Sequence, residues 1–154
     1  MNEQQEFEHN QFIISTDPEK LDLEIIHEML SRTYWARGIS REVVERSIQG
    51  ALCYGIYDHS QNPVYGRLVG FGRVITDYAT FAYLSDLFVI ESHRGLGLSK
   101  WMVECIQKHP QLQNLRRWLL VTADAHGLYQ QFGFKPLHKP EMYMEITKEN
   151  PYTS

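Results

Sequence analysis

The stretch that decides the fold reads Leu87-Phe88-Val89-Ile90-Glu91-Ser92-His93-Arg94-Gly95-Leu96-Gly97-Leu98-Ser99, and residues 100–109 continue it as a helix. A buried strand therefore passes through a short turn into a helix. This geometry directs unpaired backbone N–H groups and the positive end of the helix at one point, where phosphate binds. Gly95 and Gly97 allow positive φ angles and a close approach of a ligand, and Arg94 can pair with a phosphate oxygen. The turn predicts a site for a nucleotide-like cofactor.

Two common phosphate-binding fingerprints are absent from the turn. The dinucleotide fingerprint needs a third glycine where this chain has Lys100, and no Gly-Lys-Ser/Thr sequence of a P-loop is present. Nicotinamide cofactors and ATP are therefore disfavoured. Turns with two glycines also occur in proteins that bind nothing, so a second signal is needed.

That second signal follows the cofactor turn in the chain. Residues 117–122 form an apolar run of strand length, and residues 123–132 predict a short helix that ends at Gly133, with Phe134 opening another strand. The motifs are Arg94-Gly95-Leu96-Gly97-Leu98-Ser99 and Ala125-His126-Gly127-Leu128-Tyr129-Gln130-Gln131-Phe132-Gly133-Phe134. They resemble the GNAT superfamily of N-acetyltransferases, whose cofactor turn carries Arg/Gln-x-x-Gly-x-Gly/Ala and whose later helix carries Ala-x-x-Leu-Tyr-x-x-x-Gly-Phe.

The resemblance is close over residues 68–134 and covers the first 60 residues in outline. Two positions depart from the family pattern. Ser99 replaces the usual Gly or Ala, but serine is small and suits a helix start, so phosphate binding is expected to survive. Thr122 stands where many members have an Asn that contacts the cofactor, which puts that contact in doubt.

The resemblance implies an α/β fold of the mixed α+β kind. We expect a central mixed sheet of about six to seven strands, about four helices and a splayed pair of parallel strands. One domain is expected over residues 1–154. The expected strands are residues 11–15, 51–58, 68–76, 83–90, 117–122 and 142–146, and one opening at Phe134; the expected helices run from Asp17, as N-cap, to about Ser31, from Ser40, over 100–109 and over 123–132.

Composition agrees with one compact core. A chain of 154 residues can bury about 70% of the surface that its unfolded form exposes. The net charge of −4 with mixed signs disfavours a nucleic-acid partner. No long apolar stretch and no signal-peptide pattern appear, so we expect no membrane partner and a cytoplasmic location. Cys53 and Cys105 lack motif spacing and are expected to be buried free thiols.

The resemblance also implies acetyl-CoA as cosubstrate and names the residues that would hold it. Its pantetheine arm would lie in the gap between residues 83–90 and 117–121 and bond to the main chain of Phe88 and Val89. The pyrophosphate would bind at Arg94, Gly95, Leu96, Gly97, Leu98, Ser99 and Lys100. The histidines share no metal-ligand spacing, so no metal is expected.

Acetyl transfer to an amine needs a base, an oxyanion donor and an acid. The resemblance makes Tyr129 the acid, because a tyrosine at this place in the motif points at the CoA sulfur. Asp86 is the candidate base, since a carboxylate inside an apolar strand is costly unless it is used or paired. Two alternatives stay open: Asp86 pairs with Arg73, or a water near Ser85 relays the proton. The amide of Phe88 or Val89 would be the oxyanion donor.

The acceptor site is expected at Tyr34, Trp35, Arg37 and Tyr83. A small-molecule primary amine is the first hypothesis for the acceptor, ahead of a peptide or protein amine. Two other classes stay open: a module that binds acyl-CoA without turnover, and a structural or partner-binding protein. The presence of both Tyr129 and Asp86 favours an enzyme, acting as a monomer or homodimer.

Overall fold

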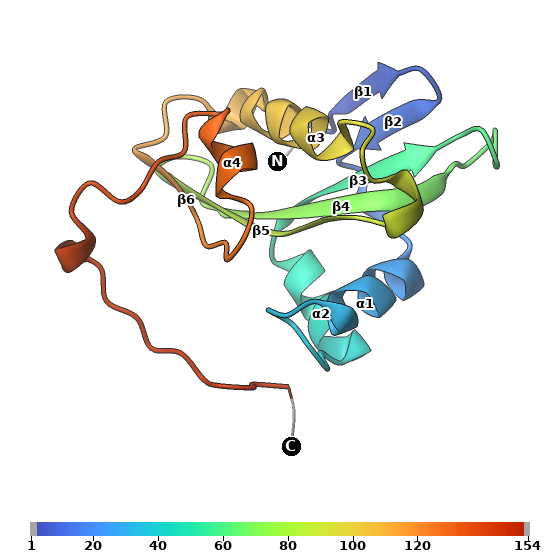
Figure 1. Ribbon diagram of the computed structural model, residues 1–154. Helices are drawn as coiled ribbons and strands as arrows, with labels where there is room; N and C mark the ends of the chain where they lie inside the picture. Colours follow the sequence, from blue (N-terminus) through green and yellow to red (C-terminus); the bar gives the residue numbers. More distant parts are fainter. Residues whose placement is uncertain (1–2, 153–154) are drawn as a thin grey trace.

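A six-stranded mixed sheet lies at the centre of the structure, a computed structural model that describes residues 3–152 (Figure 1). The strands follow one another across the sheet in chain order: β1 Glu6–His9, β2 Phe12–Ser15, β3 Leu52–Asp58, β4 Arg67–Thr76, β5 Phe81–Val89 and β6 Arg117–Leu120. Neighbours are antiparallel except β5 and β6, which are parallel. This confirms the predicted mixed fold.

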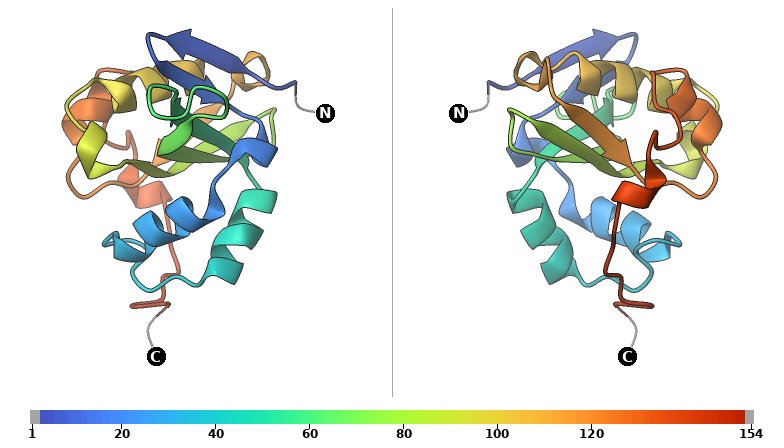
Figure 2. Two further views of the ribbon diagram at one scale, coloured as in Figure 1. Left: turned by 90° about the vertical axis from the view of Figure 1, so that its right-hand side faces the viewer. Right: turned by 90° about the vertical axis from the view of Figure 1, so that its left-hand side faces the viewer.

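Helices cover both faces of the sheet. Helices α1 (Leu23–Arg32) and α2 (Arg41–Gln49) lie on one side, and α3 (Leu98–Gln107) and α4 (His126–Gln130) on the other (Figures 1 and 2). Each amphipathic helix presents apolar residues to the core, such as Ile26 in α1, Val44 in α2 and Met102 in α3. The buried surface therefore lies in two layers, above and below the sheet.

The start of the first helix differs from the prediction. Asp17 caps only a short 3₁₀ turn, Pro18–Lys20, and α1 begins later, where the side chain of Asp22 accepts a hydrogen bond from the N–H of Ile25. Both aspartates are good N-caps, so the local sequence pattern could not distinguish them, and the predicted start of the helix was wrong. The second predicted start is confirmed, because Ser40 caps α2 through the N–H of Val43.

Both ends of the chain also differ from the prediction. Strand β1 was not expected, because its residues are polar and mostly exposed; it pairs with β2 as a hairpin. The strands predicted at Phe134 and at residues 142–146 are wrong: this segment forms a 3₁₀ turn, Pro140–Met142, and otherwise runs as extended coil away from the sheet (Figure 1).

The expected splayed pair is present at β5 and β6. Their pairing runs from Phe81 with Arg117 to Leu84 with Leu120, where β6 ends and β5 continues to Val89. A β-bulge in β5 follows directly, because Gly72 of β4 lies opposite both Asp86 and Leu87. Asp86 takes a positive φ of 57° there. The two strands therefore part at the residue predicted to be the base.

Candidate active site

The turn before α3 has the geometry of an anion site. Gly95 and Gly97 adopt φ angles of 81° and 78°, which other residues rarely adopt. Gly97 is the N-cap of α3, and no side chain of the described residues caps this helix end. The first N–H groups of α3 therefore stay available to a ligand. Arg94 donates from Nε to the carbonyl of Val89 at 3.1 Å, which ties its guanidinium to the end of β5.

A buried pair anchors the same turn from behind. His93, next to Arg94, places Nε2 2.8 Å from an oxygen of Asp58 at the end of β3, and the hydroxyl of Ser92 lies 2.7 Å from Nδ1. Burial alone would raise the pKa of Asp58, but hydrogen bonds from Ser60 and His93 outweigh it and lower the pKa. A charged carboxylate thus holds the turn to the sheet.

Three adjoining cavities lead from this turn to the splay. The turn cavity, about 200 Å³, is lined by residues 93–95 and 97–100 with Val89 and Leu128. The middle cavity, about 390 Å³, shares Val89, Arg94, Ser99 and Leu128 with it and adds Phe88 and Tyr129. The inner cavity, about 270 Å³, shares Tyr129 with the middle one and contains Asp86. Together they form one cleft. A larger hollow between the β3–β4 hairpin and α1 shares no lining residue with them.

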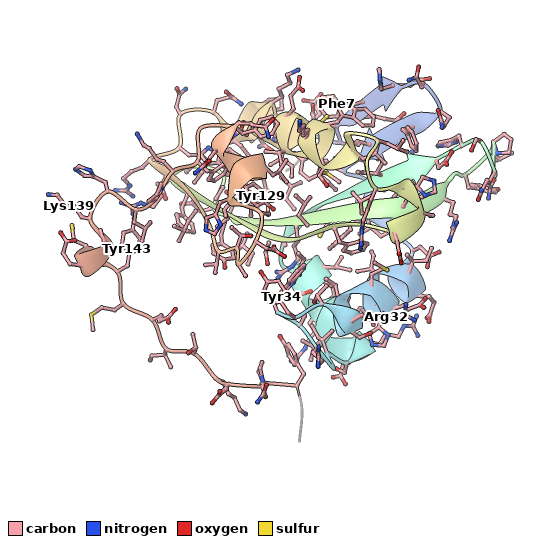
Figure 3. The ribbon with its side chains drawn as sticks, in the orientation of Figure 1. Phe7, Arg32, Tyr34, Tyr129, Lys139 and Tyr143 are labelled. Atoms are coloured by element: carbon pink, nitrogen blue, oxygen red, sulfur yellow. The ribbon has the colours of Figure 1, made fainter. Side chains whose placement is uncertain are left out.

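Tyr129 stands at the junction of the middle and inner cavities. It projects from α4, and its ring meets that of Phe134 edge-on at 5.8 Å between centroids (Figure 3). Burial, with smaller effects from Tyr34 and Asp124, raises the pKa of Tyr129 to about 12. Its hydroxyl makes no hydrogen bond to residues 3–152, so it can donate its proton to a ligand in the cleft.

Asp86 is held by two side chains from distant parts of the chain. Arg73 donates from Nε to Oδ2 at 2.8 Å, and the indole N–H of Trp35 donates to Oδ1 at 2.9 Å. The ion pair with Arg73, one of the two alternatives for Asp86, is therefore present. Each carboxylate oxygen keeps acceptor capacity for a further partner. Burial, and to a smaller extent the negative charge of Asp86, raises the pKa of the nearby Tyr83, while the positive charge of Arg73 opposes this rise.

Three of the four residues predicted for the acceptor line the inner cavity. Tyr34, Trp35 and Tyr83 do so, with the rings of Tyr34 and Trp35 meeting edge-on at 5.0 Å. The hydroxyl of Tyr34 accepts a hydrogen bond from the N–H of Ala123 and so joins the α1–α2 connection to the loop after β6. Arg37 is exposed and lines none of the three cavities, in the part of the chain that the structure describes.

Sequence reasoning missed several lining residues. Asp124 borders the middle and inner cavities, and Met29 and Thr33 border the middle one. A carboxylate just beyond the carboxyl end of a strand is a usable signal, because ligands gather there in open α/β sheets. Thr122 lines the inner cavity and accepts from the N–H of Ala125 at 3.0 Å, so it helps to shape the loop before α4.

The two leucines of the cofactor turn differ in the exposure of their side chains. The side chain of Leu98 is buried in the core, so only its backbone can meet a ligand, whereas Leu96 is exposed.

Cys53 and Cys105 are free and buried, as predicted, and burial raises the pKa of both thiols to about 12. Among residues 3–152 there is no cluster of His, Cys, Asp or Glu able to hold a metal ion and no helix long and apolar enough to cross a membrane.

Comparison with known proteins identifies the family. Residues 49–136 match the acetyltransferase (GNAT) domain. The chain belongs to this family, and the protein is an acyltransferase enzyme.

Individual relatives agree in fold and length. A GNAT-family acetyltransferase structure from Xanthomonas campestris is 45% identical, with a TM-score of 0.87 over 96% of this chain and 99% of that one. An acetyltransferase of Gibberella zeae is 28% identical over 147 residues, 85% of this chain and 83% of that protein. A Clostridium acetobutylicum acetyltransferase solved with acetyl-CoA is 13% identical, covers 96% of each chain with a TM-score of 0.59, and shares the fold alone.

Proposed function

We propose that the enzyme transfers an acetyl group from acetyl-CoA to a small primary amine, with both substrates in the cleft together. One observation carries the proposal: a single cleft joins an uncapped helix start, suited to phosphate, to a cavity that holds both a protonated tyrosine and a carboxylate. A protein that only binds acyl-CoA needs neither the tyrosine nor the carboxylate of the inner cavity.

The residues of the cleft fit acetyl-CoA in the order of its parts. The N–H groups at Gly97, Leu98, Ser99 and Lys100, with Arg94, would hold the pyrophosphate. Phe88 and Val89 lie on the part of β5 that has no β6 partner, where backbone groups can bond to pantetheine. When bound, acetyl-CoA would supply the activated acetyl thioester.

The chemistry of this chain is then divided between two groups. Asp86 takes a proton from the incoming ammonium, directly or through a water, and so frees the amine lone pair. Tyr129 donates its proton to the departing thiolate and regains one from the nitrogen that has attacked the acetyl carbon, and a pKa near 12 keeps the proton in place until it is needed. The amide N–H of Phe88 or Val89 stabilises negative charge on the acetyl oxygen.

The inner cavity supports a small cationic acceptor. Its volume of about 270 Å³ is at the low end of small-ligand pockets. Two carboxylates, Asp86 and Asp124, and the aromatic rings of Tyr34, Trp35 and Tyr83 line it. Carboxylates and aromatic faces both attract an ammonium group. A cavity of this volume suits a small molecule better than an extended peptide, so a peptide or protein amine is the weaker candidate.

The test has two stages. Calorimetric titration with acetyl-CoA measures binding, and a panel of primary amines, scored by release of free thiol, measures transfer. We expect acetyl-CoA to bind and short cationic amines to be turned over faster than neutral amines or peptides. Tight binding with no turnover of any amine would instead support an acyl-CoA-binding module.

A further inference from the structure

The tip of the cofactor turn, residues 94–97, is held mainly by its two ends. A Cβ atom added at Gly95 or Gly97 would meet no heavy atom within 4 Å beyond its chain neighbours. At one end of the tip Leu98 is buried in the core, and at the other end His93 is buried. A phosphate site made of backbone N–H groups depends on where that backbone lies. The position of the site therefore depends on these two anchors.

The ring of His93 is the polar anchor of the two. Its Nε2 lies 2.8 Å from Oδ2 of Asp58, and its Nδ1 lies 2.7 Å from the hydroxyl of Ser92. The ring of Phe12 in β2 meets it edge-on at 6.1 Å between centroids. His93 also lines the turn cavity, whereas Asp58 does not. Contacts from β2 and β3 thus fix the ring at the wall of the cavity that suits the pyrophosphate.

The hydrogen bonds of this ring are compatible with two protonation states. Against the effect of burial, hydrogen bonds from Ser60 and His93 lower the pKa of Asp58, so its carboxylate is charged and Nε2 of His93 donates to it. The hydroxyl of Ser92 can donate to Nδ1 when the ring is neutral and accept from Nδ1 when the ring is charged. The anchor keeps both bonds in either state, and only its charge changes.

The charge of the Asp58–His93 pair decides how the pair acts on a phosphate. With a neutral ring, the carboxylate leaves one negative charge behind the turn cavity, and this charge repels a pyrophosphate. With a charged ring, the pair is neutral overall, and its positive member is the one that lines the cavity. Protonation of His93 therefore favours a bound phosphate.

Other charged groups near the ring do not take over this part. Arg94 and Lys100 line the same cavity and bring positive charge to it. Glu91, on the 3₁₀ turn of His93, is exposed, so solvent screens its charge. The contacts from β2 and α4, through Phe12 and Leu128, are apolar. A histidine is the side chain whose charge changes most readily near neutral pH.

We propose that His93 is a positioning residue for the cofactor, and that binding of the pyrophosphate is coupled to protonation of its ring. The inference rests on the proposed function, because it takes the turn as the site of the pyrophosphate. His93 lines the turn cavity and not the inner cavity where transfer would occur. Its loss should therefore appear in the KM for acetyl-CoA and not in kcat.

The first test measures the affinity for acetyl-CoA by calorimetry across pH for the parent and His93→Gln. Glutamine keeps an N–H that can donate to Asp58, but it cannot take a charge. At mildly acidic pH the variant should bind at least about fivefold more weakly than the parent, the lower end of the usual coupling between two sites. Toward alkaline pH the parent loses its advantage, and the two affinities should converge. His59→Gln, on the β3–β4 hairpin and outside the cleft, is the matched control and should follow the parent.

A second variant tests the charge from the opposite side. Asp58→Asn keeps an oxygen that accepts from Nε2 but removes the negative charge. At alkaline pH, where the parent ring is neutral, this variant should bind acetyl-CoA more tightly than the parent. A purely structural role of the pair predicts weaker binding in both variants, by the same factor at every pH, and that result would overturn the coupling.

Proton uptake is the second readout. Titrations in two buffers of different ionisation enthalpy count the protons taken up on binding, and the difference between the parent and His93→Gln removes those taken up by the phosphates of the cofactor. The parent should take up more protons than the variant. Equal uptake, or parental affinity of His93→Gln throughout, would overturn the proposal. If the parent itself fails to bind acetyl-CoA at any pH, the proposed function is wrong.

Discussion

Replacing Tyr129 with phenylalanine is the sharpest test of the acid. The change removes one hydroxyl, which makes no hydrogen bond to residues 3–152, and keeps the ring that packs against Phe134. The free energy of unfolding should therefore change by less than about 1 kcal/mol, because neither a ring contact nor a hydrogen bond is lost. Any larger effect on turnover is then a property of the reaction and not of the fold.

The expected loss follows from the state of the hydroxyl. Because the pKa of Tyr129 is raised to about 12, the parent keeps this proton throughout the neutral range. General acid catalysis contributes about 10²–10⁴-fold, and a loss of about 10²-fold corresponds to about 2.7 kcal/mol in the barrier. We expect kcat to fall by at least this factor while the affinity for acetyl-CoA stays the same.

The assay is thiol release at saturating acetyl-CoA, with calorimetry for the affinity. Tyr54→Phe is the matched control, because it removes another tyrosine hydroxyl without a hydrogen-bond partner, at a position outside the cleft. The control should retain parental turnover. Full turnover of Tyr129→Phe with a good acceptor would remove Tyr129 from the mechanism.

Three further changes test other parts of the structure. Gly97→Val forces a β-branched residue to a φ of 78°, which costs about 1–3 kcal/mol of strain. Calorimetry should show that the affinity for acetyl-CoA is at least fivefold weaker. An unchanged affinity would place the phosphates elsewhere. Asp86→Asn removes the charge facing Arg73, so both the melting temperature and kcat should fall. Partial recovery of kcat at raised pH, where more of the amine is neutral, supports the role of Asp86 as base. Full activity of the variant at every pH excludes that role. Burial lowers the pKa of His109, so its ring is neutral in the folded state, and the stability that it contributes is lost as pH falls below the unfolded-state pKa of about 6.5. The free energy of unfolding of His109→Asn, measured by denaturant unfolding, should therefore depend less on pH between 7 and 5 than that of the parent. An unchanged slope would contradict this.

The turn and the helix after it could be predicted because their signals are local, whereas the splay was expected only from the family resemblance. Two glycines with positive φ, an apolar strand before them and a helical pattern after them all lie within about 25 residues. The same holds for the cap at Ser40. Where two local signals competed, as Asp17 and Asp22 do, the sequence could not decide, because tertiary packing selects between equally good caps.

The partners inside the site could be predicted only in part. The pairing of Asp86 with Arg73 joins neighbouring strands, and it was among the alternatives. The bond from Trp35 to Asp86 crosses 51 positions in the chain, and no local pattern indicates it. The contrast between Trp35, in the cleft, and Arg37, outside it, depends on the irregular path between α1 and α2. Alternation in residues 142–146 is real, but a strand needs an edge to pair with, and the sequence does not say which edge is free.

The bulge in β5 connects the opening of the cleft with the position of the carboxylate. In an unbroken strand, alternation would turn Asp86 to the face of Ala82 and Leu84. That face meets α3, since a side chain at Gly72 would touch Leu87, Met102 and Ile106. The extra residue shifts the register, so that Ser85 lies opposite Arg73 and Phe88 opposite Phe71, on the other face. Asp86 is the residue released from the alternation, which is why its carboxylate reaches Arg73 and Trp35 at the point where β6 ends and the cleft begins.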